Sequence, residues 1–139
     1  MNILVVCTGN TCRSAMAEGY LQTLLPDCDV SSAGVFAYDG DGASPLAVEV
    51  MREVDVDISA HRSRRVTQEI MDESDIILCV TEGHRRALCD RYDVKDKCFT
   101  LGQDVDDPYG ANEASYRVCR DILLELLDKV ADKIGNNTV

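Results

Sequence analysis

The chain has 139 residues, of which 45% are hydrophobic and 28% charged, as in one globular domain, which excludes a disordered tail or a fibrous repeat. The formal net charge of −11 argues against binding to nucleic acid or to an anionic membrane surface. No segment approaches the roughly 18 apolar residues of a membrane span, and the N-terminus lacks the features of a signal peptide. The seven cysteines, an odd number, therefore indicate reduced thiols and a cytoplasmic location instead of a secreted disulfide framework.

The first half of the chain predicts two strands, each followed by a helix. The continuous apolar run at residues 3–7 is typical of a strand buried in a parallel sheet. Turn residues follow at 8–11, and apolar residues then recur at helical spacing over 13–25. A second short strand is predicted at 30–33, and a second helix at about 44–54.

The second half repeats this alternation. Residues 75–80 predict a strand and are followed by a helix to about Tyr92, a weaker strand at 98–101 and an acidic loop at 102–113. A long helix over 114–134 is predicted from a line of apolar residues: Val118, Ile122, Leu126, Val130 and Ile134. We therefore predict one α/β domain over residues 1–139, a doubly wound parallel sheet with helices on both faces, whose ligand lies at the carboxyl ends of the strands.

The strongest chemical signal is the run CTGNTCRS, which joins the first predicted strand to the first predicted helix. Cys7 ends the strand and Arg13 begins the helix, so the loop amides can form an anion site at a helix N-terminus. That position and the nearby guanidinium favour a nucleophilic thiolate at Cys7, and Arg13 can bind two phosphoryl oxygens. Ser14 can donate to the sulfur, and Gly9 and Asn10 suit the tight loop.

A metal site is not expected from this sequence. The cysteines contain no C-x2-C pair, and His61 and His84 are far apart in the chain.

Together with four further segments, CTGNTCRS resembles the low-molecular-weight protein tyrosine phosphatase family. That family includes the bacterial protein arginine phosphatases and, more distantly, the thioredoxin-coupled arsenate reductases. The other matching segments are Ser32-Ala33-Gly34, the HRSRR run with His61 and Arg64, the strand DIILCV and the DDPYG run at 106–110. The resemblance covers nearly the whole chain. It implies a four-stranded parallel sheet, a phosphate-binding loop after the first strand, no metal and no organic cofactor.

The resemblance also implies a mechanism. Cys7 attacks phosphorus to form a phosphocysteine, while Arg13 and the loop bind the phosphoryl group. Asp107 protonates the leaving atom and then activates water, with Asp106 as a neighbouring competitor for this role. The implied substrate-binding residues are Thr8, Gly9, Asn10, Thr11, Cys12 and Tyr109.

Other residues are implied in supporting roles. Asn10, Ser14, Ser32 and His61 match a hydrogen-bond network that holds the loop in shape. Cys12 matches a cysteine that forms a disulfide with the nucleophile under oxidation, with thioredoxin as a candidate reductant.

Two positions favour phosphoarginine in proteins as the substrate over phosphotyrosine. Thr11 stands where tyrosine-directed relatives usually carry a bulky aliphatic residue, and its hydroxyl with Asp107 suits a planar guanidinium. Thr81 also matches the arginine-directed relatives. Tyr109 instead favours phosphotyrosine as the substrate, because an aromatic wall also accepts a phosphotyrosine ring.

Two further readings remain open. Arsenate reduction would need two relay thiols besides Cys7, and Cys79 and Cys89 are the candidates, although their spacing is wider than expected. A module that only binds phosphorylated protein would leave Asp107 without a use.

Overall fold

A four-stranded parallel sheet forms the centre of the molecule, as predicted. The computed structural model describes residues 1–136, so the last three residues of the predicted domain lie outside it. The strand order is β2-β1-β3-β4. The strands are β1 (Asn2–Cys7), β2 (Asp29–Gly34), β3 (Ile76–Cys79) and β4 (Cys98–Thr100).

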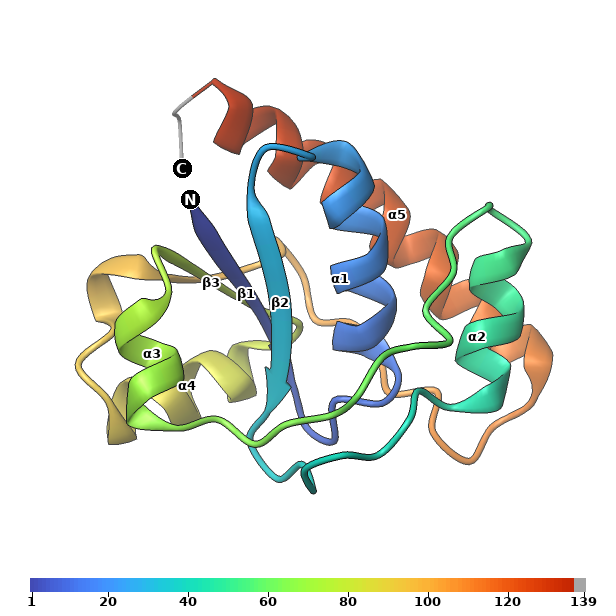
Figure 1. Ribbon diagram of the computed structural model, residues 1–139, viewed down its shortest axis with the longest axis horizontal. Coiled ribbons are helices and arrows are strands. Elements are labelled where there is room, and N and C mark those ends of the chain that lie inside the picture. Colours follow the sequence, from blue (N-terminus) through green and yellow to red (C-terminus); the bar gives the residue numbers. More distant parts are fainter. Residues whose placement is uncertain (137–139) are drawn as a thin grey trace.

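Helices cover both faces of the sheet, which confirms the doubly wound architecture (Figure 1). One face carries α1 (Arg13–Leu24), α2 (Pro45–Arg52) and α5 (Glu113–Gly135). The other carries α3 (Gln68–Glu73) and α4 (Glu82–Arg91), and a short 3-10 turn at Lys95–Lys97 leads into β4. Side chains of β1 alternate between the two hydrophobic clusters, because successive residues of a strand point to opposite faces.

Helix α3 and the buried face of α5 differ from the prediction. The pattern did not predict α3, because this helix has only six residues and Met71 is its one buried residue. On α5 the predicted apolar line is wrong at its start, since Val118 is 60% exposed. A line of residues four apart drifts by about 40° per step around a helix, so it cannot follow one face. The side chains that are buried include Tyr116, Cys119, Leu123 and Leu127.

The loops that follow the strands meet at the carboxyl edge of the sheet. The Val35 and Phe36 amides donate to the carbonyls of Cys7 and Thr8, both at 3.0 Å, and the Val105 amide donates to the Val80 carbonyl at 2.9 Å. These bonds bring the segments after β1, β2 and β4 to one place, where a doubly wound fold binds its ligand.

Within residues 1–136, no helix has the length and hydropathy of a membrane-spanning segment.

Candidate active site

The Cys7 sulfur lies at the centre of the loop between β1 and α1, surrounded by donors. Ser14 Oγ is 2.8 Å from Cys7 Sγ, and the Asn10 amide donates to the sulfur at 3.3 Å. Ser14 Oγ also accepts from Asn10 Nδ2 at 2.8 Å, so its own proton is directed to the sulfur. Two hydrogen-bond donors, the Ser14 hydroxyl and the Asn10 amide, are therefore directed at the Cys7 sulfur.

Asn10 holds the loop in shape from a fully buried position. It takes a φ of 58°, in the left-handed region that Asn tolerates. Its Nδ2 donates to Ser14 and to Ser32, both at 2.8 Å, and its Oδ1 accepts from the Arg64 amide at 3.0 Å. His61 Nε2 lies 2.7 Å from the Asn10 carbonyl oxygen. The structure thus brings Asn10, Ser14, Ser32 and His61 into one network.

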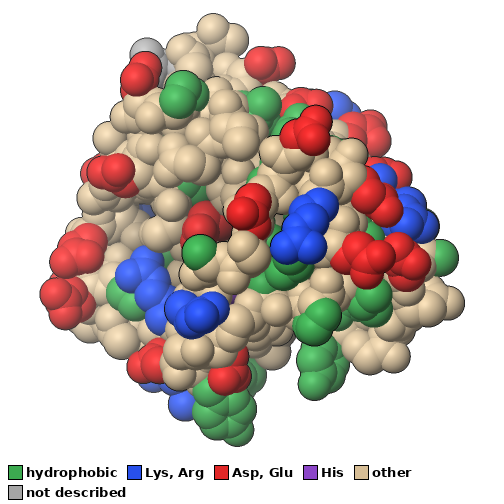
Figure 2. Space-filling view, turned by 45° about the vertical axis from the view of Figure 1, so that its right-hand side comes forward, with side chains coloured by type: hydrophobic (Ala, Val, Ile, Leu, Met, Phe, Trp, Pro, Cys, Tyr) green, Lys and Arg blue, Asp and Glu red, His purple; other side chains and the backbone are tan. Residues whose placement is uncertain are grey.

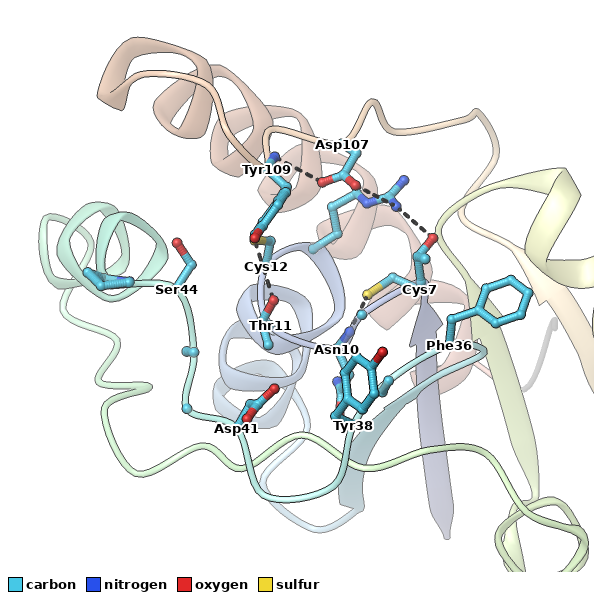
Figure 3. Close-up of a pocket in the computed structure, with 17 residues that line it drawn as sticks. Cys7, Asn10, Thr11, Cys12, Phe36, Tyr38, Asp41, Ser44, Asp107 and Tyr109 are labelled. Carbon is cyan, nitrogen blue, oxygen red and sulfur yellow. Dashed lines mark hydrogen bonds and ion pairs between the residues drawn. The ribbon is translucent and has the colours of Figure 1, made fainter.

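Arg13 connects this loop to the acidic loop that follows β4. Its side chain is almost fully buried, and Nη1 donates to the Val105 carbonyl at 2.8 Å. Nη2 is 3.4 Å from Thr8 Oγ1 and 3.6 Å from Asp107 Oδ2 (Figure 3). Asp107 Oδ1 accepts from the Tyr109 amide at 3.0 Å, which fixes the carboxyl group near the guanidinium.

These residues line a pocket of about 510 Å³. All of Cys7, Thr8, Gly9, Asn10, Thr11, Cys12, Arg13, Asp107 and Tyr109 face it, and Asp106 does not. The pocket also has the aromatic side chains of Phe36, Tyr38 and Tyr109 and the carboxylate of Asp41, which lies across from Asp107 (Figure 3). The site therefore combines a thiol at the base of a loop that could bind an anion with walls that are both aromatic and acidic.

The Cys12 thiol is poorly suited to ionise. Tyr116 Oη lies 3.3 Å from Cys12 Sγ and accepts from Ser44 Oγ at 3.0 Å, so the Tyr116 proton is directed to the sulfur. Burial nevertheless raises the pKa of Cys12. Burial also raises the pKa of the nearby Cys119 to about 12. Cys7 and Cys12 line the same pocket as free thiols.

The two candidate relay thiols are poorly placed to reach Cys7. Cys79 belongs to the hydrophobic cluster under α3 and α4, and Cys89 packs against the same cluster. Cys7 belongs to the cluster on the opposite face of the sheet. The neighbour of Cys79 is Cys98, with 3.6 Å between the sulfurs. A disulfide relay from Cys7 would have to cross the sheet.

Several residues of the site were not predicted. Phe36, Tyr38 and Asp41 lie in the loop after β2, and His84 lies on α4. The loop after β2 could have been expected near the site, because it follows a strand at the carboxyl edge of the sheet. The residues of this loop, however, form no recognisable motif. Within residues 1–136, no group of three or more His, Cys, Asp and Glu side chains is arranged so that it could hold a metal ion.

Charged and hydrophobic side chains share one face of the molecule. Figure 2 shows Asp and Glu side chains spread over the visible face, together with Lys and Arg side chains and a few projecting hydrophobic groups. Among the described residues the large exposed hydrophobic side chains include Phe36, Tyr38 and Tyr109, and all three border the pocket.

Comparisons with known proteins agree with this geometry. The family model described as low molecular weight phosphotyrosine protein phosphatase matches residues 2–139. A protein-arginine-phosphatase of Geobacillus stearothermophilus is 43% identical, with 95% of each chain covered. A low molecular weight protein-tyrosine-phosphatase, PtpB, of Staphylococcus epidermidis is 34% identical over 96% of this chain and 99% of its own. Among solved structures, a C7S mutant of the YwlE arginine phosphatase with a phosphorylated active-site serine has a TM-score of 0.92 at 36% identity, covering 97% of this chain and 96% of its own.

Proposed function

The chain belongs to the low molecular weight phosphotyrosine protein phosphatase family, and from this premise we propose that it hydrolyses phosphoarginine in proteins. Family membership makes it a cysteine-dependent hydrolase of phosphorylated proteins. The observation that carries the choice of phosphoarginine is the lining of the pocket. Two carboxylates, Asp41 and Asp107, and the Thr11 hydroxyl surround the space beyond the phosphate loop. A guanidinium carries positive charge and several N–H donors, so it matches these acceptors.

The first chemical step forms a phosphocysteine. Cys7 Sγ attacks phosphorus, an S–P bond forms, and the P–N bond to the guanidino nitrogen breaks. Asp107 donates a proton to that nitrogen, and the arginine side chain leaves. Arg13 and the amides at the N-terminus of α1 stabilise the charge on the three equatorial oxygens.

The second step regenerates the enzyme. Asp107 takes a proton from water, the water oxygen attacks phosphorus, and the S–P bond breaks to release inorganic phosphate. Sulfur leaves as a thiolate that accepts from Ser14 and from the Asn10 amide. The phosphorylated serine in the related C7S mutant supports an intermediate on residue 7.

Phosphotyrosine is the second candidate substrate. The aromatic side chains of Phe36, Tyr38 and Tyr109 at the pocket would pack against a phenyl ring. The same rings also accept a guanidinium through cation–π contacts, so they are compatible with both substrates.

The proposal extends to the cellular setting. The free thiols of Cys7 and Cys12 fit a reducing cytoplasm. The formal net charge of −11 argues for phosphorylated proteins as partners and against nucleic acid or an anionic membrane. Under oxidation by hydrogen peroxide, Cys7 thiolate gives a sulfenic acid and hydroxide, and the Cys12 thiol then displaces water to form the disulfide. The dithiol of thioredoxin would return both electrons and restore Cys7.

The test is the ratio of kcat/KM for two peptides that differ only in carrying phosphoarginine or phosphotyrosine. The buffer is reducing and free of metal, and Cys7→Ser is the blank. We expect phosphoarginine to be favoured by about tenfold or more, which corresponds to ~1.4 kcal/mol in the transition state. A preference for phosphotyrosine would establish the second candidate. Turnover of neither peptide, together with arsenate-dependent oxidation of thioredoxin, would instead identify a reductase.

A further inference from the structure

We propose that His84, which lies outside the phosphate loop, positions Thr8 and through it Arg13 for binding of the phosphoryl group. His84 is a positioning residue, because it does not line the pocket. The inference rests on the phosphatase chemistry proposed for Cys7 and Arg13, and it is independent of the choice between phosphoarginine and phosphotyrosine.

The His84 side chain is held between two threonines. It is 8% exposed, with Nδ1 2.8 Å from Thr81 Oγ1 and Nε2 2.8 Å from Thr8 Oγ1. Thr81 Oγ1 also accepts from the His84 amide at 3.1 Å, as the N-cap of α4. Both the backbone and the ring of His84 are therefore fixed by Thr81.

The protonation state of the ring suits this role. Burial, followed by the nearby charge of Arg13, lowers the pKa of His84 to about 4, so the ring is neutral at neutral pH. A neutral ring with its proton on Nε2 donates to Thr8 Oγ1, and its Nδ1 accepts from the Thr81 hydroxyl. Thr8 Oγ1 then accepts from both His84 and Arg13, and its own proton is left for a phosphoryl oxygen.

Thr8 is one of few groups that orient the Arg13 guanidinium. The others are the Val105 carbonyl and the Asp107 carboxylate. A displaced Thr8 would free Nη2 of Arg13, which faces the transferring group. Small misplacements of such a group weaken transition-state stabilisation far more than they weaken the fold.

The experiment is a double-mutant cycle between residues 84 and 8. His84→Phe keeps a ring in the cavity and removes both hydrogen bonds, His84→Gln keeps an amide donor, and Thr8→Val removes the acceptor. Each variant is assayed for kcat and KM with p-nitrophenyl phosphate, for inhibition by orthovanadate, and for thermal unfolding. Orthovanadate resembles the transferring group, so its Ki reports on Arg13 even where turnover is low.

We expect His84→Phe to lower kcat/KM and to raise the vanadate Ki by about 10- to 100-fold, the range that misplacement of a binding group produces. His84→Gln should restore most of both. In the Thr8→Val background, His84→Phe should have less than about a twofold further effect, because the coupling is already lost.

A destabilised α4 must be distinguished from a misplaced Thr8. Leu88→Ala is the matched control, since Leu88 is buried on α4 one turn after His84 and its side chain takes no part in this hydrogen-bond chain. It should lower the unfolding temperature and leave the vanadate Ki unchanged. If His84→Phe fails to fold, His84→Asn replaces it, because its shorter side chain cannot reach Thr8.

Two results would overturn the inference. One is a vanadate Ki that stays at the wild-type value in the His84 variants. The other is a double mutant whose loss of kcat/KM equals the product of the losses in His84→Phe and Thr8→Val, which would mean that the two residues act independently. Absence of turnover in the wild type, with vanadate binding still detected by titration calorimetry, would refute the proposed function and leave the His84 test intact, with the vanadate Kd in place of the Ki.

Discussion

At the scale of single residues, Asp41 is the acidic side chain in the pocket with no assigned role in the chemistry. Its backbone is anchored on both sides by Ser63: the Asp41 amide donates to Ser63 Oγ at 3.0 Å, and the Ser63 amide donates to the Asp41 carbonyl at 2.7 Å. The pocket therefore presents this carboxylate on a fixed backbone, across from Asp107 (Figure 3). A cationic substrate gains from this arrangement, and a neutral phenyl ring does not.

Asp41→Asn should reduce kcat/KM for a phosphoarginine peptide by about fivefold, because a partly solvated charge pair contributes about 1 kcal/mol. The value for a phosphotyrosine peptide should change little. Glu49→Gln is the control for the loss of one negative charge from the protein, because it removes an exposed carboxylate on α2 that does not line the pocket. Equal losses on both peptides would show that Asp41 does not select the substrate.

Thr11 is the second residue that bears on selectivity. Thr11→Ile should shift the ratio of kcat/KM toward phosphotyrosine by about tenfold, because it removes a hydroxyl and adds apolar contact area to the wall. Thr11→Ser, which keeps the hydroxyl, should retain the wild-type preference. The two peptides of the previous test measure this ratio, and an unchanged ratio in Thr11→Ile would exclude Thr11 as a determinant.

At the scale of elements, the end of β2 is packed directly against the phosphate loop. A Cβ at Gly34 would overlap the Thr8 carbonyl oxygen and lie 3.0 Å from the Asn10 amide nitrogen. These contacts are with backbone, so the loop itself would have to move. The absence of a side chain at Gly34 is thus a condition for the loop shape that directs Asn10 to Cys7.

Gly34→Ala should therefore lower kcat/KM by about 100-fold or more, with a weakened response to vanadate, since the loop amides lose their alignment. Gly83→Ala on α4 is the control, because the nearest atom to its added Cβ is 3.6 Å away. Steady-state kinetics on both variants checks this, and near-normal activity in Gly34→Ala would mean that the loop tolerates the shift.

The strands and the longer helices were predictable because each carries a strong local signal. Apolar runs at 3–7 and 75–80 mark buried strands, and Pro45 marks the start of α2. Helix α3 could not be predicted, because one and a half turns with one buried side chain leave no periodic pattern. Val118 was assigned to the wrong face because packing against α1 and α2 decides which face of α5 is buried.

At the scale of the whole molecule, the predictable part of the site is the part that is continuous in sequence. The run from Cys7 to Ser14 carries its chemistry on one loop, and sequence alone placed it at the end of β1. Asp41 and His84 join it only because the sheet order brings the loops after β2 and β3 to the same edge. No local sequence pattern around Asp41 or His84 indicates that these residues lie near the Cys7 loop.

The stability of the whole fold should fall as the pH is lowered from 7 toward 4. Burial lowers the pKa of His84 from 6.5 to about 4, so in this window the unfolded chain binds a proton that the native state does not. Hydrogen bonds from Arg117 and Arg120 lower the pKa of Glu53 from 4.5 to about 2, which extends the loss to still lower pH. Unfolding in urea at pH 7 and pH 4.5 measures the effect.

The variant His84→Gln isolates the contribution of the imidazole. Its midpoint of unfolding should fall less than the wild-type midpoint between pH 7 and pH 4.5, because the titrating group has been removed. An identical decline in both proteins would mean that carboxylates alone govern the acid sensitivity.

The acidic loop is attached to the rest of the molecule just before Asp107. Val105 bonds through its amide to Val80 and through its carbonyl to Arg13, and Asp104 accepts from the Glu82 amide at 2.8 Å. Asp107, the proposed proton donor, is thus held beside Arg13, whereas Phe36, Tyr38 and Asp41 lie on the separate loop after β2. Substitutions of the exposed side chains of Phe36, Tyr38 and Asp41 can consequently give descendants of one ancestor new targets, while the bonds that tie this loop to the site, and the proposed bond-breaking residues, stay the same.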